Sequence, residues 1–158
     1  MKRFVVLLAA ALAVFPALTY AQSQTEAEVT QTILDAYEYT NTHQRSPEGD
    51  YSMEGAFEFW SSGGLLNEIP AGTRPDEFEA INLRAKHIQV TTLVEGQAAV
   101  AHFYSEGSLT PKGASAINNY ITRVTQVYVK EDGAWRIRAS HWSPLTGGSG
   151  TTQTVLDN

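Results

Sequence analysis

RVTQVYVKEDGAWRI, the sequence of residues 123–137, has the pattern of two β-strands joined by a tight turn. Large side chains alternate with smaller or polar ones on both sides of Asp132-Gly133, and a period of two is typical of strands with one buried face. Asp-Gly accommodates the positive φ angles of a two-residue hairpin turn, so the turn fixes the register. Counting outward pairs Lys130 with Trp135, Tyr128 with Ile137, Gln126 with Ala139, and Val124 with His141.

A second hairpin is expected immediately before this one. Residues 83–94 and 97–105 show the same period of two, and Glu95-Gly96 between them is a turn signal. A two-residue turn places Ile88 opposite Phe103 and Val90 opposite Ala101. Residues 107–119 contain Pro111 and Gly113 and are expected to form a loop between the two hairpins.

The segment before the hairpins predicts an amphipathic helix over residues 26–43. Thr25 and Glu28 have the spacing of a capping box. The residues that share one helical face are Val29, Ile33, Ala36, Tyr37 and Thr40. Pro47 and Gly49 then end the helix, and residues 51–60 fit either a short helix or a strand. The predicted fold class is therefore α+β.

Residues 1–21 predict a cleavable secretory signal. Lys2 and Arg3 precede an apolar run from Phe4 to Leu18, and Ala21 supplies a small residue for cleavage. The run is shorter than the roughly 20 residues that cross a bilayer, which favours cleavage over an anchor. The expected organisation is a signal at 1–21, one domain at 22–145 and a glycine-rich flexible tail at 146–158, in a periplasmic or secreted protein.

The charge of the chain restricts its partners. It has 17 acidic and 11 basic residues, and two of the basic ones lie in the signal. Without a cluster of lysines or arginines, neither nucleic acid nor an anionic membrane surface is an expected partner after cleavage. The sequence has no cysteine, and its four histidines lack the close spacing of a metal site, so we expect no disulfide, metal or cofactor.

A helix followed by long hairpins, ending in the quoted stretch and then His141-Trp142-Ser143, resembles the NTF2-like superfamily in its SnoaL-like and DUF4440-like branches. The resemblance covers residues 25–145. It implies a strongly curved antiparallel sheet packed on the N-terminal helix and short helices, enclosing an apolar pocket in a cone. It also implies a homodimer through the outer sheet face. It implies no particular reaction, because members of this superfamily include isomerases, cyclases, dehydratases and domains that only bind or assemble.

The predicted register assigns an inner face to the last hairpin. Its members would be Val124, Gln126, Tyr128, Trp135, Ile137, Ala139, His141 and Ser143. We expect a ligand to contact Tyr37, Trp60, Gln126, Tyr128, Trp135, Ile137 and His141. For Tyr37, Tyr128 and Trp135 the alternative is a place in the core, which is the commoner role of such aromatic residues. His141 is also a candidate catalytic residue, because an imidazole exchanges protons near neutral pH; the alternative is a structural histidine.

Glu58 is the second candidate catalytic residue. Beside Phe57, Phe59 and Trp60, a desolvated carboxylate could act as a base. Since Glu58 alternates with Phe57 and Phe59, however, solvent exposure is the favoured expectation. The isomerase-like branch pairs its base with a tyrosine and a second acid. Tyr37 could supply the tyrosine, but the sequence shows no matching pair of acids.

Three functions follow as hypotheses. The first is an exported protein that binds a small, largely apolar ligand. The second is a cofactor-independent isomerase-like or dehydratase-like enzyme that uses a pocket histidine or glutamate, and the third is a non-catalytic dimerisation scaffold. The expected dimer face carries Arg123, Thr125, Val127, Arg136, Arg138, Ser140 and Trp142.

Overall fold

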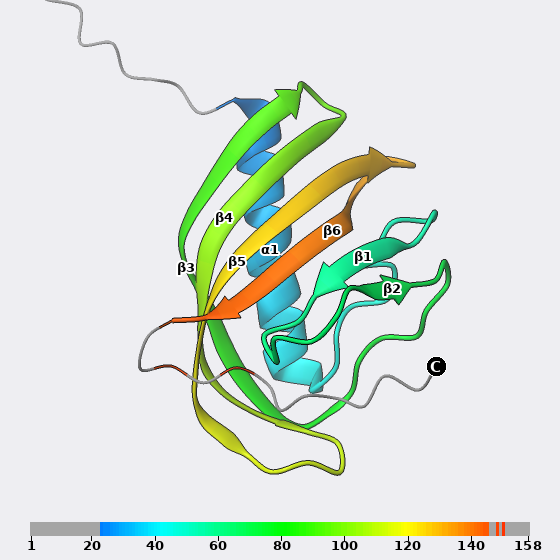
Figure 1. The fold of residues 1–158 in the computed structure, drawn as a ribbon. Helices are drawn as coiled ribbons and strands as arrows, with labels where there is room; N and C mark the ends of the chain where they lie inside the picture. Colours follow the sequence, from blue (N-terminus) through cyan, green and yellow to red (C-terminus); the bar gives the residue numbers. More distant parts are fainter. Residues whose placement is uncertain (1–22, 146–147, 149, 151–158) are drawn as a thin grey trace, which may run out of the picture.

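The computed structural model describes residues 23–145, 148 and 150 as one helix packed against a six-stranded sheet (Figure 1). The elements in chain order are α1 Gln24–His43, β1 Ala56–Phe59, β2 Asn67–Ile69, β3 Phe78–Val94, β4 Ala98–Pro111, β5 Ile117–Glu131 and β6 Ala134–Pro144. The sheet order is β2-β1-β6-β5-β4-β3. The expected signal at 1–21 and nearly all of the expected tail lie outside the described residues.

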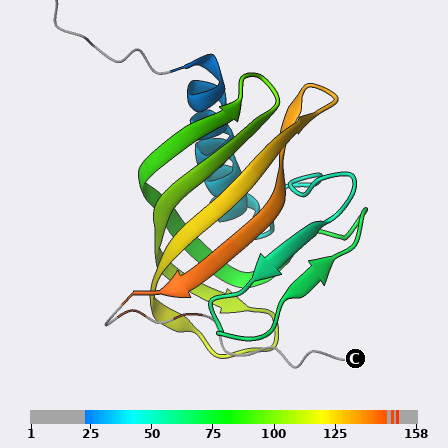
Figure 2. The ribbon, with the colours of Figure 1, turned by 45° about the horizontal axis from the view of Figure 1, so that its top comes forward.

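The sheet is strongly curved and open, and α1 lies against its inner face (Figure 2). The expected α+β class is confirmed. One correction concerns strand direction, because β1 runs parallel to β6 and the sheet is therefore mixed. A second concerns the expected short helices: within the described residues α1 is the only helix, and the segment after it forms the strands β1 and β2. No described helix is long and apolar enough to cross a membrane.

The helix begins slightly earlier than predicted. Ser23 is the N-cap and forms a capping box with Glu26, whereas Thr25 and Glu28 were expected to do so. The Thr25 hydroxyl instead donates to Glu95 and accepts from the Gly96 amide, which attaches the start of α1 to the β3–β4 turn. Because a capping box needs only a hydroxyl and an acid three residues apart, the sequence offers both registers.

The β3–β4 hairpin confirms the predicted pairing of Val90 with Ala101. The loop expected at 107–119 is shorter, because β4 continues to Pro111 and β5 starts at Ile117. Gly107 makes this continuation possible. Its φ of 147° and the Asn82 carbonyl, which a Cβ would strike, both require glycine at this position of the strand pair.

The β5–β6 hairpin follows the predicted register only near its turn. Lys130 pairs with Trp135 and Tyr128 with Ile137 as expected, but Val127 then pairs with Ala139. Arg138 is thus an extra residue in β6, a β-bulge that shifts every later pair by one position. Gln126 pairs with Ser140 rather than Ala139, and Val124 with Trp142 rather than His141.

The main core lies between α1 and the inner face of β4, β5 and β6. Val29 and Ile33 of α1 pack there against Phe103, Val124 and Ile137. A second cluster around Ile81, Leu109, Ile117 and Tyr120 fills the lower end of the sheet in Figure 1. The part of the inner face that neither cluster fills borders the cavity described next.

Candidate functional site

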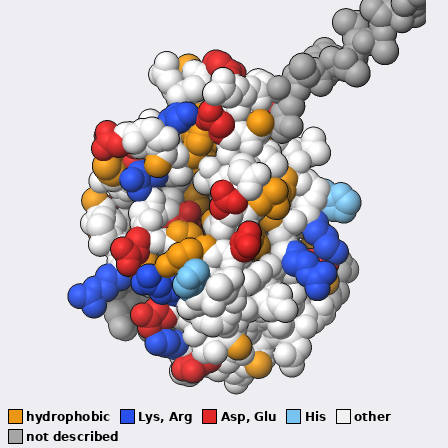
Figure 3. Space-filling view, turned by 180° about the vertical axis from the view of Figure 1, so that it is seen from behind, with side chains coloured by type: hydrophobic (Ala, Val, Ile, Leu, Met, Phe, Trp, Pro, Cys, Tyr) orange, Lys and Arg blue, Asp and Glu red, His pale blue; other side chains and the backbone are white. Residues whose placement is uncertain are grey.

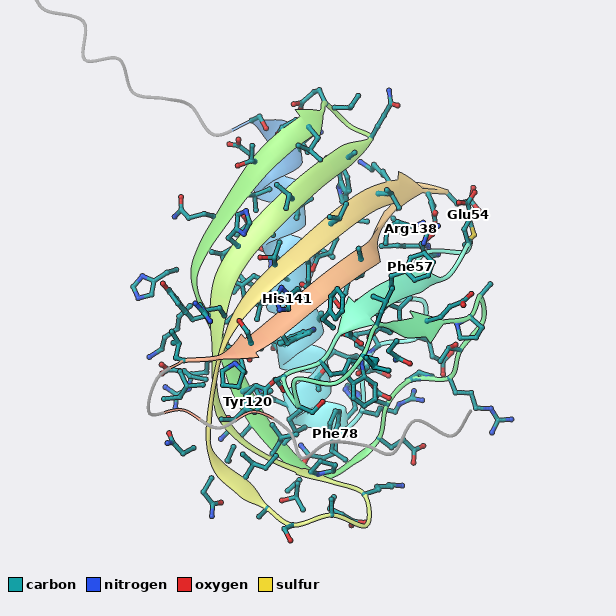
Figure 4. The ribbon with its side chains drawn as sticks, viewed as in Figure 1. Glu54, Phe57, Phe78, Tyr120, Arg138 and His141 are labelled. Atoms are coloured by element: carbon teal, nitrogen blue, oxygen red, sulfur yellow. The ribbon has the colours of Figure 1, made fainter. Side chains whose placement is uncertain are left out.

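A cavity of about 410 Å³ lies between the C-terminal half of α1 and the inner face of the sheet. Its walls are largely apolar and aromatic, and they include Phe78 and Tyr120, which lie at the same end of the molecule near the end of α1 (Figure 4). Seen from the side opposite to Figure 1, hydrophobic and acidic side chains lie next to one another in the middle of the surface (Figure 3). A cavity of this size, with a mainly apolar lining and a few polar groups, is typical of small-molecule sites.

Glu58 is the acidic residue most firmly held in the cavity. It lies on β1 opposite Ser140 of the parallel strand β6, and only 6% of it is exposed. Its Oε1 accepts hydrogen bonds from Ser140 Oγ at 2.6 Å and Trp142 Nε1 at 2.7 Å. Its Oε2 accepts one from Trp60 Nε1 at 2.6 Å and a longer one from Tyr51 at 3.4 Å. Burial raises the pKa of Glu58, and the hydrogen bonds from Ser140, Trp142 and Trp60 oppose that rise.

The expectation that Glu58 faces solvent is wrong. Strand β1 does alternate, but its exposed face carries Phe57 and Phe59 while Glu58 points inward. The reason is the set of four donors, which replaces the hydration that a buried carboxylate loses. Two of these donors, Ser140 and Trp142, come from a distant strand and lie beyond its bulge, so local alternation could not reveal them.

The β-bulge at Arg138 selects the β6 side chains that face the cavity. Beyond it, Ser140 is buried and Trp142 lines the cavity, whereas His141 is exposed on the opposite face. There the His141 ring packs edge-on against Phe59, with ring centres 5.7 Å apart. The expected positions of Ala139, His141 and Ser143 on the inner face are therefore wrong. The expected outer positions of Ser140 and Trp142 are wrong for the same reason.

Asp50 is an acid that the sequence did not single out. The loop after α1 is attached to β6, because the Ile137 amide donates to the Asp50 carbonyl at 2.8 Å and the Ser52 amide donates to the Ile137 carbonyl. The Asp50 side chain lines the cavity and its carboxyl group forms no hydrogen bond within residues 23–145. Burial, reinforced by the charges of Glu58 and Asp76, raises the pKa of Asp50 to about 7.

Asp76 brings a third carboxyl group to the mouth of the cavity. The Ser46 amide donates to its carbonyl oxygen at 2.9 Å, which ties the segment before β3 to the residues that follow α1. Its side chain is more exposed than that of Asp50, and partial burial raises its pKa. Asp50 and Asp76 both lie in irregular segments where no periodicity indicates which way a side chain points, so sequence patterns gave no signal for either.

Tyrosines provide the other polar groups in the cavity wall. Tyr128 donates to Gln126 Oε1 at 2.8 Å. The Tyr37 hydroxyl is buried and forms no hydrogen bond with any described residue. Burial raises the pKa of Tyr37 well above its ordinary value, and the nearby Ser105 hydroxyl opposes that rise.

The structure brings together most of the predicted site residues. Those that line this one cavity are Tyr37, Glu58, Trp60, Gln126, Tyr128 and Ile137. His141 does not reach it, and neither does Trp135. The Trp135 indole donates instead to Glu28 of α1 at 2.9 Å, which makes it a contact between the helix and the β5–β6 hairpin. Among the described residues no group of three or more side chains is placed to hold a metal ion.

The solved structures that are similar to this chain include the following three. A protein of unknown function from Pseudomonas putida, described as NTF2-like, aligns with a TM-score of 0.51 at 14% identity, over 83% of this chain and 96% of its own. The chain has an NTF2-like fold. A candidate aromatic ring hydroxylase from Novosphingobium aromaticivorans aligns with a TM-score of 0.54 at 15% identity, over 79% and 92% of the two chains.

The third structure with this NTF2-like fold is the CaMKII hub homology domain of Chlamydomonas reinhardtii. It aligns with a TM-score of 0.52 at 15% identity, over 77% of this chain and 98% of its own. No family model and no curated protein matches the sequence. At these identities the likeness concerns the fold, so any function must be argued from the cavity itself.

Proposed function

We propose that this protein binds a small molecule with a largely apolar body in the cavity, and that the carboxyl groups of Asp50 and Glu58 contact the polar end of that molecule. The observation that supports this most directly is the Asp50 carboxyl group, which borders an apolar cavity without a hydrogen bond from residues 23–145. A desolvated polar group without a partner is costly, and such groups concentrate where a ligand supplies the partner.

A fluorescent apolar probe tests this proposal. N-phenyl-1-naphthylamine, which is uncharged at neutral pH, should gain fluorescence on binding at one site per chain. Ala36→Trp, which places an indole in the cavity wall next to Tyr37, should abolish the gain, and Leu83→Trp should do so from β3. Thermal melts show whether each variant is folded. Probe binding that persists in both folded variants, or no binding by the unaltered protein, would reject the proposal.

A second candidate function is general acid–base catalysis by Asp50. A base works best with a pKa near the working pH, and the pKa of about 7 at Asp50 meets this requirement. Asp50 takes the role that the sequence hypothesis gave to His141 or Glu58, since His141 faces away and Glu58 is held by donors. Conversion of 3-cyclohexenone to 2-cyclohexenone is a suitable assay. Activity should rise through about pH 7 and disappear in Asp50→Asn; an unchanged rate in that variant would exclude this function.

Self-association through the outer face of the sheet is a further part of the proposal. Phe57 and Phe59 of β1 are 43% and 45% exposed and lie beside Ala139 and His141 of β6 on this face. No described helix or strand covers them. Exposed aromatic rings beside an arginine are more typical of interfaces than of bare surface, and Arg138 lies 5.6 Å from the centre of the Phe57 ring. A second copy of the chain is the occupant that we propose.

The site of action proposed for the protein is the periplasm or the extracellular medium. The support is the sequence of residues 1–21 alone, with its basic start, apolar run and small residue at position 21. N-terminal sequencing of exported protein should find Gln22 first. Met1 at the start of the exported chain would show an uncleaved anchor.

A further inference from the structure

The cavity has an unequal balance of charges. The acidic side chains that line it are Asp50, Glu58, Asp76 and Glu77. The only basic side chain in the described lining is Lys112, and it is paired with Glu77 at the exposed rim. Three carboxyl groups therefore border this space without an ion pair to any described lysine or arginine.

The hydrogen bonds to Glu58 stabilise its charge but do not neutralise it. All four donors are uncharged, and an indole N–H can only donate, so Trp60 and Trp142 favour the ionised form of the carboxyl group. These donors therefore bring no positive charge to balance an ionised Glu58. The charge of Glu58 also acts on Asp50. Burial raises the pKa of Asp50, and the charges of Glu58 and Asp76 raise it further.

Asp50 forms no ion pair with any described lysine or arginine, either in the cavity or in the neighbouring surface hollow. The groups that surround it are Glu58 from β1, Asp76 from the segment before β3, Tyr37 from α1, Tyr128 from β5 and its neighbour Tyr51. Asp50 also lines a second hollow of the surface, which contains Glu28, Glu48, Lys130 and Arg136. Lys130 is paired there with Glu28 and Arg136 with Glu131, so neither cation is committed to Asp50.

Aromatic rings complete the same space. The indole rings of Trp60 and Trp142 line the cavity while their N–H groups bond to Glu58, and Tyr51 and Tyr128 add two phenol rings. The faces of such rings attract cations, most strongly where water is excluded. Carboxylates and aromatic rings are the groups with which proteins bind positive charge on an apolar body, and both line this cavity.

We propose that the ligand of this cavity is a protonated amine carried on an apolar body, and that its ammonium group pairs with the Asp50 carboxylate. This rests on the proposed binding function and specifies the chemical class of its ligand. A neutral ligand would leave three carboxyl groups without a counter-charge. An ammonium would supply both the missing donor at Asp50 and the missing positive charge.

The test compares two probes that share a naphthylethyl body and differ in the terminal group, which is an ammonium in 2-(1-naphthyl)ethylamine and a hydroxyl in 2-(1-naphthyl)ethanol; both are titrated by calorimetry. At about pH 8 the amine should bind at least about tenfold more tightly than the alcohol, since a charge-assisted bond replaces a neutral one. The preference should fall as pH drops below about 7, because Asp50 then becomes protonated while the amine stays charged.

Asp50→Asn should reduce amine affinity at least about tenfold and leave alcohol affinity within about twofold. Asp76→Asn should have a smaller effect in the same direction, because Asp76 is more exposed. Glu54→Gln is the matched control: its side chain is 80% exposed beside Arg138, outside the cavity, and neither affinity should change.

The outcomes separate the two proposals. Equal affinity of amine and alcohol overturns the amine inference but leaves the binding function standing. Tight amine binding that Asp50→Asn does not weaken also overturns it, because the ammonium then lies elsewhere. If neither naphthyl probe nor the neutral fluorescent probe binds, the binding function fails and the amine inference fails with it.

Discussion

Asp50 and Glu58 are two carboxyl groups in one cavity with opposite local environments. Glu58 receives four hydrogen bonds, and the Asp50 carboxyl group receives none from residues 23–145. Replacing each acid by its amide should therefore change stability in opposite directions, because the amide keeps the shape and removes the charge.

Asp50→Asn should stabilise the protein at alkaline pH. The pKa of Asp50 is raised in the folded state from 3.8 to about 7, so folded Asp50 holds its proton more tightly and stability falls as pH rises between these values. Removing the charge should add about 1–3 kcal/mol at about pH 8 and nearly nothing at about pH 4. Thermal melts across this range measure the difference. If Asp50→Asn is less stable than the unaltered protein at alkaline pH, the Asp50 carboxylate must have a stabilising partner, which contradicts the prediction.

Glu58→Gln should destabilise the protein at neutral pH by about 1–3 kcal/mol. The amide NH₂ group must replace one carboxylate oxygen, which leaves at least one indole N–H of Trp60 or Trp142 facing another donor. Urea unfolding measures the loss. Glu68→Gln on β2, an exposed position, is the control and should change little. A fully stable Glu58→Gln would mean that the four hydrogen bonds are not needed.

Glu58 and Asp50 also differ in how far their roles could be predicted from the sequence. The sequence indicated Glu58 as a candidate because aromatic residues surround it, but alternation with Phe57 and Phe59 wrongly favoured a side chain that faces solvent. The sequence did not indicate Asp50, since the direction of a loop side chain depends on what the loop backbone binds. Here that partner is Ile137, which is distant in the sequence.

At the level of elements, α1 is joined to the β5–β6 hairpin through Glu28. Its Oε2 accepts from Lys130 Nζ at 2.7 Å and from Trp135 Nε1 at 2.9 Å. Hydrogen bonds from Lys130, Trp135 and Gln24, in that order, lower the pKa of Glu28 to about 2. This contact explains why Trp135, predicted to bind ligand, belongs to the junction of helix and sheet.

Glu28→Gln should lower the melting temperature at neutral pH. A carboxyl group with a lowered folded pKa adds stability above its unfolded value of 4.5, and that contribution disappears as pH falls toward about 2. The variant and the unaltered protein should therefore converge in acid. Glu38→Gln, on an exposed position of the same helix, serves as control. A constant difference at every pH would show that the lost packing, rather than the charge, is responsible.

In the β5–β6 hairpin, the pairing register could be predicted from the sequence near the turn but not beyond the bulge. Asp132-Gly133 fixed the register as far as Tyr128 and Ile137, because turn chemistry acts locally. The bulge at Arg138 has no such marker: Arg138 and Ala139 are neither glycine nor proline and fit a regular strand. The pairing of β6 with β1 and the burial of Trp142 beside Glu58 favour the bulge, and both are tertiary contacts.

For the whole molecule, the hairpins and the leading amphipathic helix were enough to predict an α+β fold, and the resemblance to the NTF2-like superfamily implied the cavity. The predicted helical face was correct, since Ile33, Ala36, Tyr37 and Thr40 all line that cavity. For β1 the sequence left a short helix and a strand open, and β2 was not predicted, because each has four residues or fewer; β1 pairs with the distant strand β6, and β2 pairs with β1. Strand β1 carries Glu58 inward and the exposed Phe57 and Phe59 outward, so it borders both the cavity and the outer face.

The proposed dimer depends on this outer face, where Figure 4 shows Phe57, Arg138 and His141 on the side of the sheet away from α1. Phe59→Asp should convert a dimer into a monomer, because a carboxylate buried at an interface without a partner opposes association. Its folded core should persist, since Phe59 is 45% exposed and contacts His141 alone among the described aromatic rings.

Leu34→Asp is the matched control for this last prediction. Leu34 is 42% exposed on α1, the helix that packs on the opposite face of the sheet, and the same change of charge there should leave the dimer intact. Light scattering at micromolar concentration gives the mass of each variant, and melts confirm folding. A monomeric unaltered protein would reject the dimer. A dimer that survives Phe59→Asp but not Leu34→Asp would place the interface on the helix, and the exposed phenylalanines would then need another partner.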